Sequence, residues 1–254
     1  MFSEEKRCYY QKSPLAEVIC QLRFPRILTI NANPPADFQE QIRSQFPQYS
    51  ASTENPMQVS TGEAQTKIIN YRFSSHDGLW HVNLTQDTIS LSTQKYTGWE
   101  NFAERLDRPL AAFIQQYKPA YFERIGLRYI NFFSRSKLGL EDVPFRDLFA
   151  PEYLGLLHNE TLPESAFNRS TMDADVDIGN SCRLQFHAGP GLVNIQGQPS
   201  KEVHFILDCD YYMKERLPVN YSAGALQTLH GKAFPVFRGA ITDLMHNAMD
   251  PTDI

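Results

Sequence analysis

The sequence lacks the features that mark membrane proteins and secreted proteins, and the charge that most nucleic-acid-binding proteins carry. No stretch of its 254 residues approaches 18 consecutive apolar residues, and the segment from Met1 to Arg7 has no apolar run of the signal-peptide kind. The formal net charge is −5 and the pI is about 5.8. The basic excess that phosphate contacts require is therefore absent over the whole chain, and nucleic-acid binding is disfavoured. We expect a cytoplasmic protein without membrane attachment.

Cysteines and catalytic motifs are also scarce. The chain has four cysteines and no CxxC pair, and Cys20, Cys182 and Cys209 lie in apolar, strand-like runs. We therefore expect free, buried thiols in a reducing compartment. The motifs GxxxxGK[ST], GxGxxG, HExxH and GxSxG do not occur. No catalytic residue, cofactor or metal site is assigned; whether the protein is an enzyme stays open, with a non-catalytic role favoured.

What the sequence does contain predicts an α+β protein with a sizeable core. Hydrophobic residues make up 42% of the chain, and it has 17 Phe and 12 Tyr. Residues 15–24 and 121–133 alternate apolar and polar side chains, as half-buried strands do. Apolar residues at intervals of three and four predict helices over 97–117, with Thr97 as N-cap, and over 222–249. Pro109 and Pro235 predict a kink or break in each.

The order strand, helix, four strands, long helix occurs twice, in residues 1–118 and 119–254. It predicts a large, mainly antiparallel sheet with long helices on one face, resembling TATA-binding-protein and helix-grip folds. We expect the two β-α-β4-α halves to form one compact globular unit. An internal duplication and a chance similarity of order both remain open.

Two segments resemble a known family. Residues 13–24 (SPLAEVICQLRF) and 122–131 (FERIGLRYIN) are similar to the hallmark segments of a sporadically distributed, uncharacterised prokaryotic family. The resemblance implies a bacterial or archaeal protein of an accessory or defence-type system. It brings no activity, cofactor or catalytic residue.

Five residues on the polar faces of the predicted strands are candidate ligand- or partner-binding residues: Arg23, Arg128, His187, His204 and Asp208. An ordinary solvated face with cross-strand ion pairs is the favoured interpretation, ahead of ligand or partner binding. A metal held by His187, His204 and Asp208 is the third alternative.

Two further segments have a structural and a functional interpretation. The segment from His187 to Gly191 is glycine-rich, and we interpret it as a hairpin turn rather than a phosphate-binding loop. The three aspartates in 173–177 indicate an exposed sheet edge more strongly than a divalent-cation site.

The sequence thus favours a non-catalytic interaction protein that uses an open sheet face or edge to bind a protein partner or a second copy of itself. The first alternative is a ligand sensor or enzyme with a pocket between the sheet and the long helices. The second is nucleic-acid binding.

Overall fold

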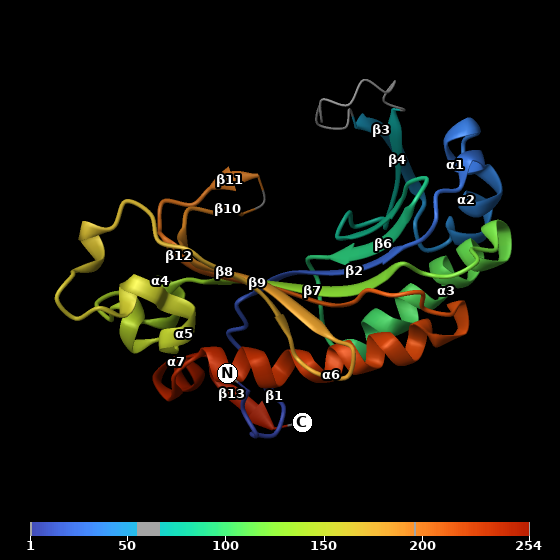
Figure 1. The fold of residues 1–254 in the computed structure, drawn as a ribbon. Coiled ribbons are helices and arrows are strands. Elements are labelled where there is room, and N and C mark those ends of the chain that lie inside the picture. The colour runs from blue at the N-terminus through green and yellow to red at the C-terminus, as the bar shows by residue number, and fades with distance from the viewer. Residues whose placement is uncertain (1, 55–66, 196, 254) are drawn as a thin grey trace, which may run out of the picture. The chain divides into compact units, whose positions relative to one another are not determined.

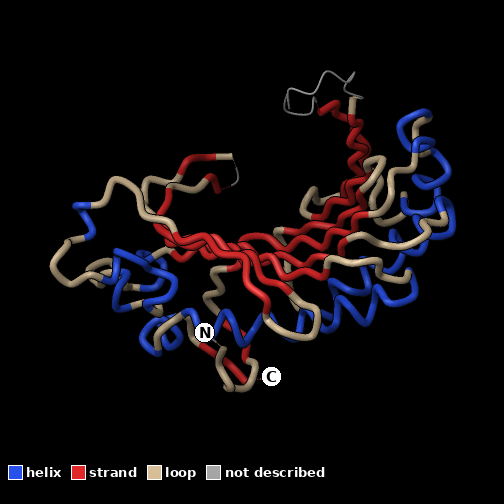
Figure 2. Tube along the Cα trace, in the orientation of Figure 1, coloured by secondary structure: helices blue, strands red, loops and turns tan. Residues whose placement is uncertain are grey.

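The computed structural model describes residues 2–54, 67–195 and 197–253, and it shows an α+β protein built on one nine-stranded sheet (Figures 1 and 2). The strand order is β3-β4-β5-β6-β2-β7-β12-β9-β8. These strands are β2 (Leu15–Arg23), β3 (Gln48–Glu54), β4 (Ile68–Ser74), β5 (Trp80–Leu84), β6 (Thr88–Thr93), β7 (Arg124–Phe133), β8 (Met172–Asp177), β9 (Arg183–Gly191) and β12 (His204–Met213). The neighbouring pairs from β3 to β2 and from β12 to β8 are antiparallel.

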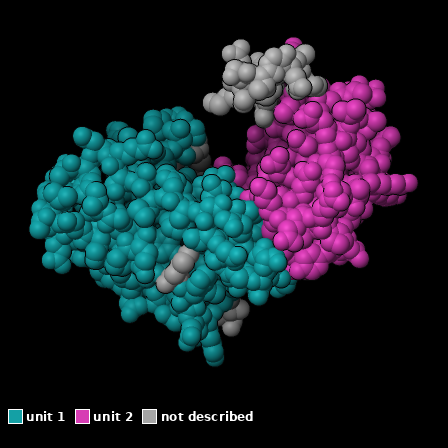
Figure 3. Space-filling view, in the orientation of Figure 1, with its two compact units in different colours: residues 1–16, 128–212, 227–254 teal, residues 17–127, 213–226 magenta. Residues whose placement is uncertain are grey.

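The chain divides into two compact units (Figure 3). Unit 1 comprises residues 1–16, 128–212 and 227–254, and unit 2 comprises residues 17–127 and 213–226. The two continuous halves 1–118 and 119–254 and an internal duplication both stay predictions.

Unit 2 packs three helices on one face of strands β2 to β6 (Figure 1). They are α1 (Leu28–Ala32), α2 (Ala36–Ile42) and α3 (Trp99–Tyr117). Phe102 and Phe113 of α3 are fully buried, and their rings lie 5.9 Å from Trp80 and 4.5 Å from Phe24. The alternation predicted for β2 is confirmed. Val18 and every second residue after it, up to Phe24, are completely buried.

Unit 1 packs most of α6 (Ser222–Ala240) on one face of β7, β12, β9 and β8 (Figure 1). Phe133 of β7 stacks on Phe237 of the helix at 5.9 Å, and the Tyr211 hydroxyl of β12 donates to the Ala233 carbonyl oxygen at 3.4 Å. Phe205 and Leu207 are fully buried, as their alternation predicts. The remaining elements of this unit are β1 (Cys8–Tyr10), α4 (Arg135–Leu138), α5 (Pro151–Leu154), β10 (Asn194–Ile195), β11 (Gln198–Pro199), α7 (Asp243–Ala248) and β13 (Pro251–Asp253).

The cysteine prediction is confirmed for three of the four residues. Cys20, Cys182 and Cys209 are free and buried, whereas Cys8 is half-buried. Burial raises the pKa of the Cys209 thiol to about 12, so this group stays protonated at neutral pH.

The predicted helices differ from the structure in three details. Neither Pro109 nor Pro235 breaks its helix, because α3 and α6 continue past them, and a kink at each stays a prediction. The C-terminal helical segment ends its first helix at Ala240 instead. The packed apolar side of each helix outweighs the one backbone hydrogen bond that a proline removes. Thr97 does not cap α3; Gly98 occupies that position with a φ of 155° and no side-chain hydrogen bond.

The glycine-rich segment is also not a hairpin turn. Residues up to Gly191 belong to β9, and Gly191 lies opposite His204 of β12. Gly189 has a φ of 154°, and a Cβ atom there would lie 2.3 Å from the carbonyl oxygen of Ser170. The glycine is therefore needed inside a strand where another backbone segment comes close.

Two other sequence predictions concern the membrane and a weak strand. Within residues 2–54, 67–195 and 197–253, no helix has the length and apolar character that crossing a bilayer requires. The sequence also contains a weak strand-like run over residues 57–60, which lies outside the described residues.

Candidate functional site

The structure joins two of the predicted site residues directly. Arg128 of β7 and Asp208 of β12 form a two-point ion pair: Arg128 Nε donates to Asp208 Oδ1 at 2.7 Å, and Arg128 Nη2 donates to Asp208 Oδ2. The Asp208 side chain is 14% exposed and that of Arg128 is 44% exposed. The carboxylate is thus largely removed from water and held by the planar fork of an arginine.

His187 extends this contact across the sheet. It lies directly opposite Asp208 on β9, and Asp173 of β8 lies directly opposite His187. The His187 Nδ1 and Asp173 Oδ1 atoms are 2.7 Å apart. Residues directly opposite each other share one face of a sheet, so Arg128, Asp208, His187 and Asp173 form a continuous polar row over four strands.

A second polar group lies beside this row. Asp175 accepts from Arg183 Nε at 3.0 Å and from the Tyr212 hydroxyl at 2.9 and 3.0 Å. Hydrogen bonds with Tyr212 and then with Asp175 raise the pKa of the Arg183 guanidinium. We call these outer residues of unit 1 the aspartate face; its charged members are Arg128, Asp173, Asp175, Asp177, Arg183, His187, Asp208 and Asp210.

The aspartate face is the opposite side of the strands from α6. Asp208 alternates with the buried Leu207 and Cys209, and these buried neighbours lie on the helix side with Tyr211. Asp173, Asp175 and Asp177 are exposed on β8, which is the last strand of the sheet. Their position at the edge agrees with the favoured interpretation of the three aspartates.

His204 does not lie in the solvated layer in which the sequence places it. Its side chain is buried, and Nδ1 lies 3.0 Å from the carbonyl oxygen of Glu202. The Glu202 carboxylate is held in place by three hydrogen bonds. It accepts from Ser134 Oγ at 2.8 Å, from Ser136 Oγ at 2.6 Å and from the backbone N of Ser136 at 3.0 Å. These bonds bring the segment before β12 against the start of α4, and His204 is buried there.

Glu202 is a strongly perturbed group that the sequence reasoning missed. Burial alone would raise the pKa of its carboxyl, but the hydrogen bonds from Ser136 and Ser134 hold it at about 2. Only the contact between residues 134–136 and residue 202 reveals this site. No sequence motif near Glu202 predicts this environment.

Arg23 is the fifth predicted site residue, and it belongs to unit 2. It ends β2, is exposed, and lies opposite Thr88 of β6. It is therefore not a member of the aspartate face. The metal alternative also receives no support, because among the described residues no three His, Cys, Asp or Glu side chains are placed to hold an ion.

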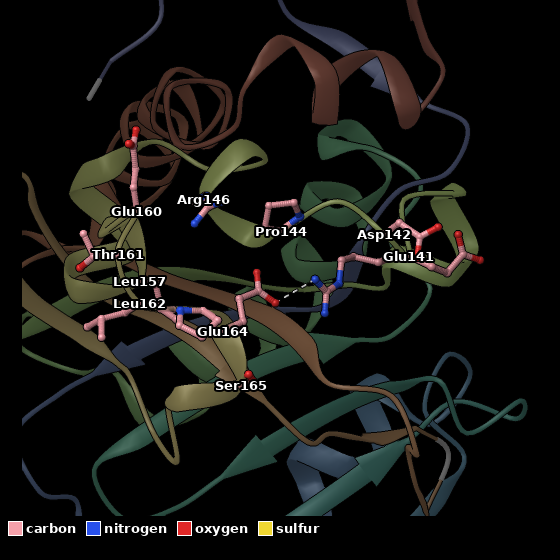
Figure 4. Close-up of a pocket in the computed structure, with 12 residues that line it drawn as sticks. Glu141, Asp142, Pro144, Arg146, Leu157, Glu160, Thr161, Leu162, Glu164 and Ser165 are labelled. Atoms are coloured by element: carbon pink, nitrogen blue, oxygen red, sulfur yellow. Dashed lines mark hydrogen bonds and ion pairs between the residues drawn. The ribbon is translucent and has the colours of Figure 1, made fainter.

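A pocket of about 560 Å³ lies in unit 1, in the connections that follow β7 (Figure 4). It is not the predicted pocket between the sheet and the long helices. Its charged lining residues are Arg135, Glu141, Asp142, Arg146, Glu160 and Glu164.

The position of Arg135 in this pocket is fixed by three contacts. Its Nη1 donates to Glu164 Oε2 and to the Val143 carbonyl oxygen, both at 3.0 Å. Its guanidinium lies 4.1 Å from the centre of the Phe145 ring. Arg135 is thus a preorganised cation in the wall of the pocket.

No protein-family model matches this chain, and no curated protein matches its sequence.

Proposed function

We propose that the protein is a non-catalytic binding protein that engages a macromolecular partner through the aspartate face. The observation that carries this proposal is the continuous row from Arg128 through Asp208 and His187 to Asp173. The row lies on the side of the strands that α6 does not cover, where charged side chains remain accessible to a partner.

The charge of the face indicates what kind of partner it suits. It carries five aspartates against two arginines and one histidine. A negatively charged surface attracts a positively charged one and repels phosphates, so a protein with a basic surface fits better than a nucleic acid. The resemblance to a patchily distributed prokaryotic family supports a place in an accessory or defence-type system of the cytoplasm.

Affinity capture with a charge-reversed variant tests this proposal. We expect the native protein to capture a basic protein, with binding that weakens as salt increases. Asp173→Lys should reduce that capture at least about tenfold, because it reverses a charge at the exposed end of the row. Glu104→Lys on α3 makes the same charge change at an exposed position of unit 2 and should bind normally.

Two results would count against the aspartate face. One is a partner whose capture does not depend on salt. The other is equal capture by Asp173→Lys and the native protein.

The pocket around Arg135 supports a second candidate function, the binding of a small ligand. Its volume of about 560 Å³ lies within the range of ligand sites, and its charged lining of two arginines and four carboxylates suits a small ligand that carries a cationic group. Figure 4 shows Glu160 and Arg146 at this site. A ligand of this class should raise the melting temperature of the native protein more than that of Glu160→Gln, and unchanged melting across a panel of cationic metabolites would reject this function.

A further inference from the structure

The two edge strands of the nine-stranded sheet differ in how they are protected against pairing with another strand. β8 carries three exposed aspartates in six residues, and such charges prevent edge-to-edge pairing. In β3, by contrast, only the last residue, Glu54, is charged. From Gln48 to Thr53 it contains no charged residue and no proline, and all six residues are exposed.

β3 also has a regular backbone. Its seven residues pair with β4 in an unbroken register from Gln48 opposite Ser74 to Glu54 opposite Ile68, without a bulge. An antiparallel edge strand of this length presents alternating N–H and C=O groups at the spacing with which another extended strand pairs. The chemistry of the edge therefore selects a β-strand as its partner.

We propose that the partner strand is β3 of a second copy of this chain, paired antiparallel about a twofold axis through Ala51. This register places Tyr49 opposite Thr53 of the second copy on one face of the sheet. On the other face it places Ser50 opposite Ser52. Pairs of an aromatic with a β-branched residue, and pairs of hydroxyl side chains, are favourable cross-strand neighbours.

The same register explains why β3 suits a second copy and β8 does not. Two copies of β3 bring no like charges together between Gln48 and Thr53, whereas two copies of β8 would bring aspartates together. An interface made by one strand from each copy is small, so the dimer is weak and its population rises with protein concentration. This inference is independent of the aspartate face, because β3 belongs to unit 2.

Cysteine cross-linking tests both the dimer and its register. Across the twofold axis the Cα atoms of the two Ala51 residues would be about 4.5–5.5 Å apart, within the range of a disulfide. The two Ser50 residues would be about 8 Å apart, outside that range. In a Cys8→Ser background, Ala51→Cys should therefore form a covalent dimer at least about tenfold faster than Ser50→Cys.

Charge substitution at the axis supplies the second readout, by sedimentation of the full chain. Ala51→Lys and Ala51→Glu should each be monomeric, because each places like charges opposite each other, whereas a mixture of the two should form dimers. Ser44→Lys, at an exposed position after α2, adds the same charge away from β3 and should dimerise as the native chain does.

Three results would overturn the inference. The first is a native chain that stays monomeric at concentrations up to about 1 mM. The second is a dimer that Ala51→Lys does not weaken. The third is equal cross-linking at positions 50 and 51. Circular dichroism of each variant separates loss of pairing from loss of folding.

Discussion

Arg128 Nε lies 2.7 Å from Asp208 Oδ1, and this ion pair joins β7 to β12 on the aspartate face of unit 1. The two side chains differ in exposure, because Asp208 is 14% exposed and Arg128 is 44% exposed. The cost of breaking the pair therefore depends on which residue is replaced. Removing the arginine leaves a largely buried carboxylate without its fork of donors, whereas removing the aspartate leaves a cation that water reaches.

We expect Arg128→Gln to lower the free energy of unfolding by about 1–2 kcal/mol, as for a buried acceptor that loses a charged donor. The matched control is Arg183→Gln, because the Arg183–Asp175 pair has both side chains more than two-fifths exposed. Exposed pairs contribute little to stability, so Arg183→Gln should cost less than Arg128→Gln. Urea denaturation of both variants measures the difference, and an equal loss would contradict this account.

His230 of α6 makes the stability of unit 1 sensitive to acid. Arg7 donates to His230 Nε2 from its guanidinium, and the Tyr129 hydroxyl lies 2.9 Å from Nδ1. Because Arg7 has only donors, Nε2 must be the acceptor, and the ring proton lies on Nδ1. Burial, and then the positive charge of Arg7, lower the pKa of His230 to about 3.

The lowered pKa fixes the direction of the pH effect. The unfolded chain binds a proton at its ordinary pKa of about 6.5, and the folded protein does not until about pH 3. The stability due to neutral His230 is therefore complete above about pH 6.5 and declines as the pH falls toward 3. Between pH 6 and 4, we expect the native protein to lose up to about 1.4 kcal/mol per pH unit more than His230→Gln.

Urea unfolding at several pH values gives this difference directly. His76→Gln is the control, because His76 lies in an exposed turn between β4 and β5. Parallel pH profiles for the native protein and His230→Gln would show that His230 is not the acid-sensitive group.

The polar row shows what strand periodicity predicts and what it leaves undetermined. Alternation places Asp208 on the polar face of its strand because successive side chains point to opposite sides. The same rule holds for Arg128 and His187, and the structure brings all three together. The register that sets Asp208 opposite His187 depends on contacts between segments about 20 residues apart, which a period of two does not specify.

His204 and the pocket show the limits of local patterns. His204 has the same parity as Asp208, but the anchoring of Glu202 at α4 removes it from water. The pocket is built from short helices and turns around Arg135 and Glu164, where no regular spacing exists. In both cases a long-range contact decides the environment of the side chain.

We expect the Glu202 carboxylate to contribute more to the free energy of unfolding than most carboxylates near the surface do. Glu202→Gln keeps one acceptor oxygen but loses the charge and the second acceptor, so part of the hydrogen bonding to Ser134 and Ser136 is lost. We expect a loss of about 1–3 kcal/mol at pH 7. Glu215→Gln, at an exposed position after β12, should cost less than about 0.5 kcal/mol.

The pH dependence of this loss is specific. The pKa of Glu202 is held at about 2, below its ordinary value of 4.5, so its contribution is complete above about pH 4.5 and disappears as the pH falls toward 2. The difference between the native protein and Glu202→Gln should therefore shrink below pH 4.5. A difference that is constant from pH 7 to pH 3 would mean that the carboxylate charge is not the cause.

Gly189 gives a test of the packing that places β9 beside the chain before β8. Its φ of 154° is a conformation that side chains rarely adopt, and a Cβ atom would lie 2.3 Å from the backbone oxygen of Ser170. Since a backbone atom cannot rotate away as a side chain can, Gly189→Ala should lower the free energy of unfolding by at least about 2 kcal/mol.

Gly78→Ala is the matched control, because Gly78 also has a positive φ, of 69°, but no atom within 4 Å of the added carbon. It should cost only about 1 kcal/mol, from backbone strain alone. Equal losses in thermal or urea unfolding would mean that the close approach of Ser170 does not constrain β9.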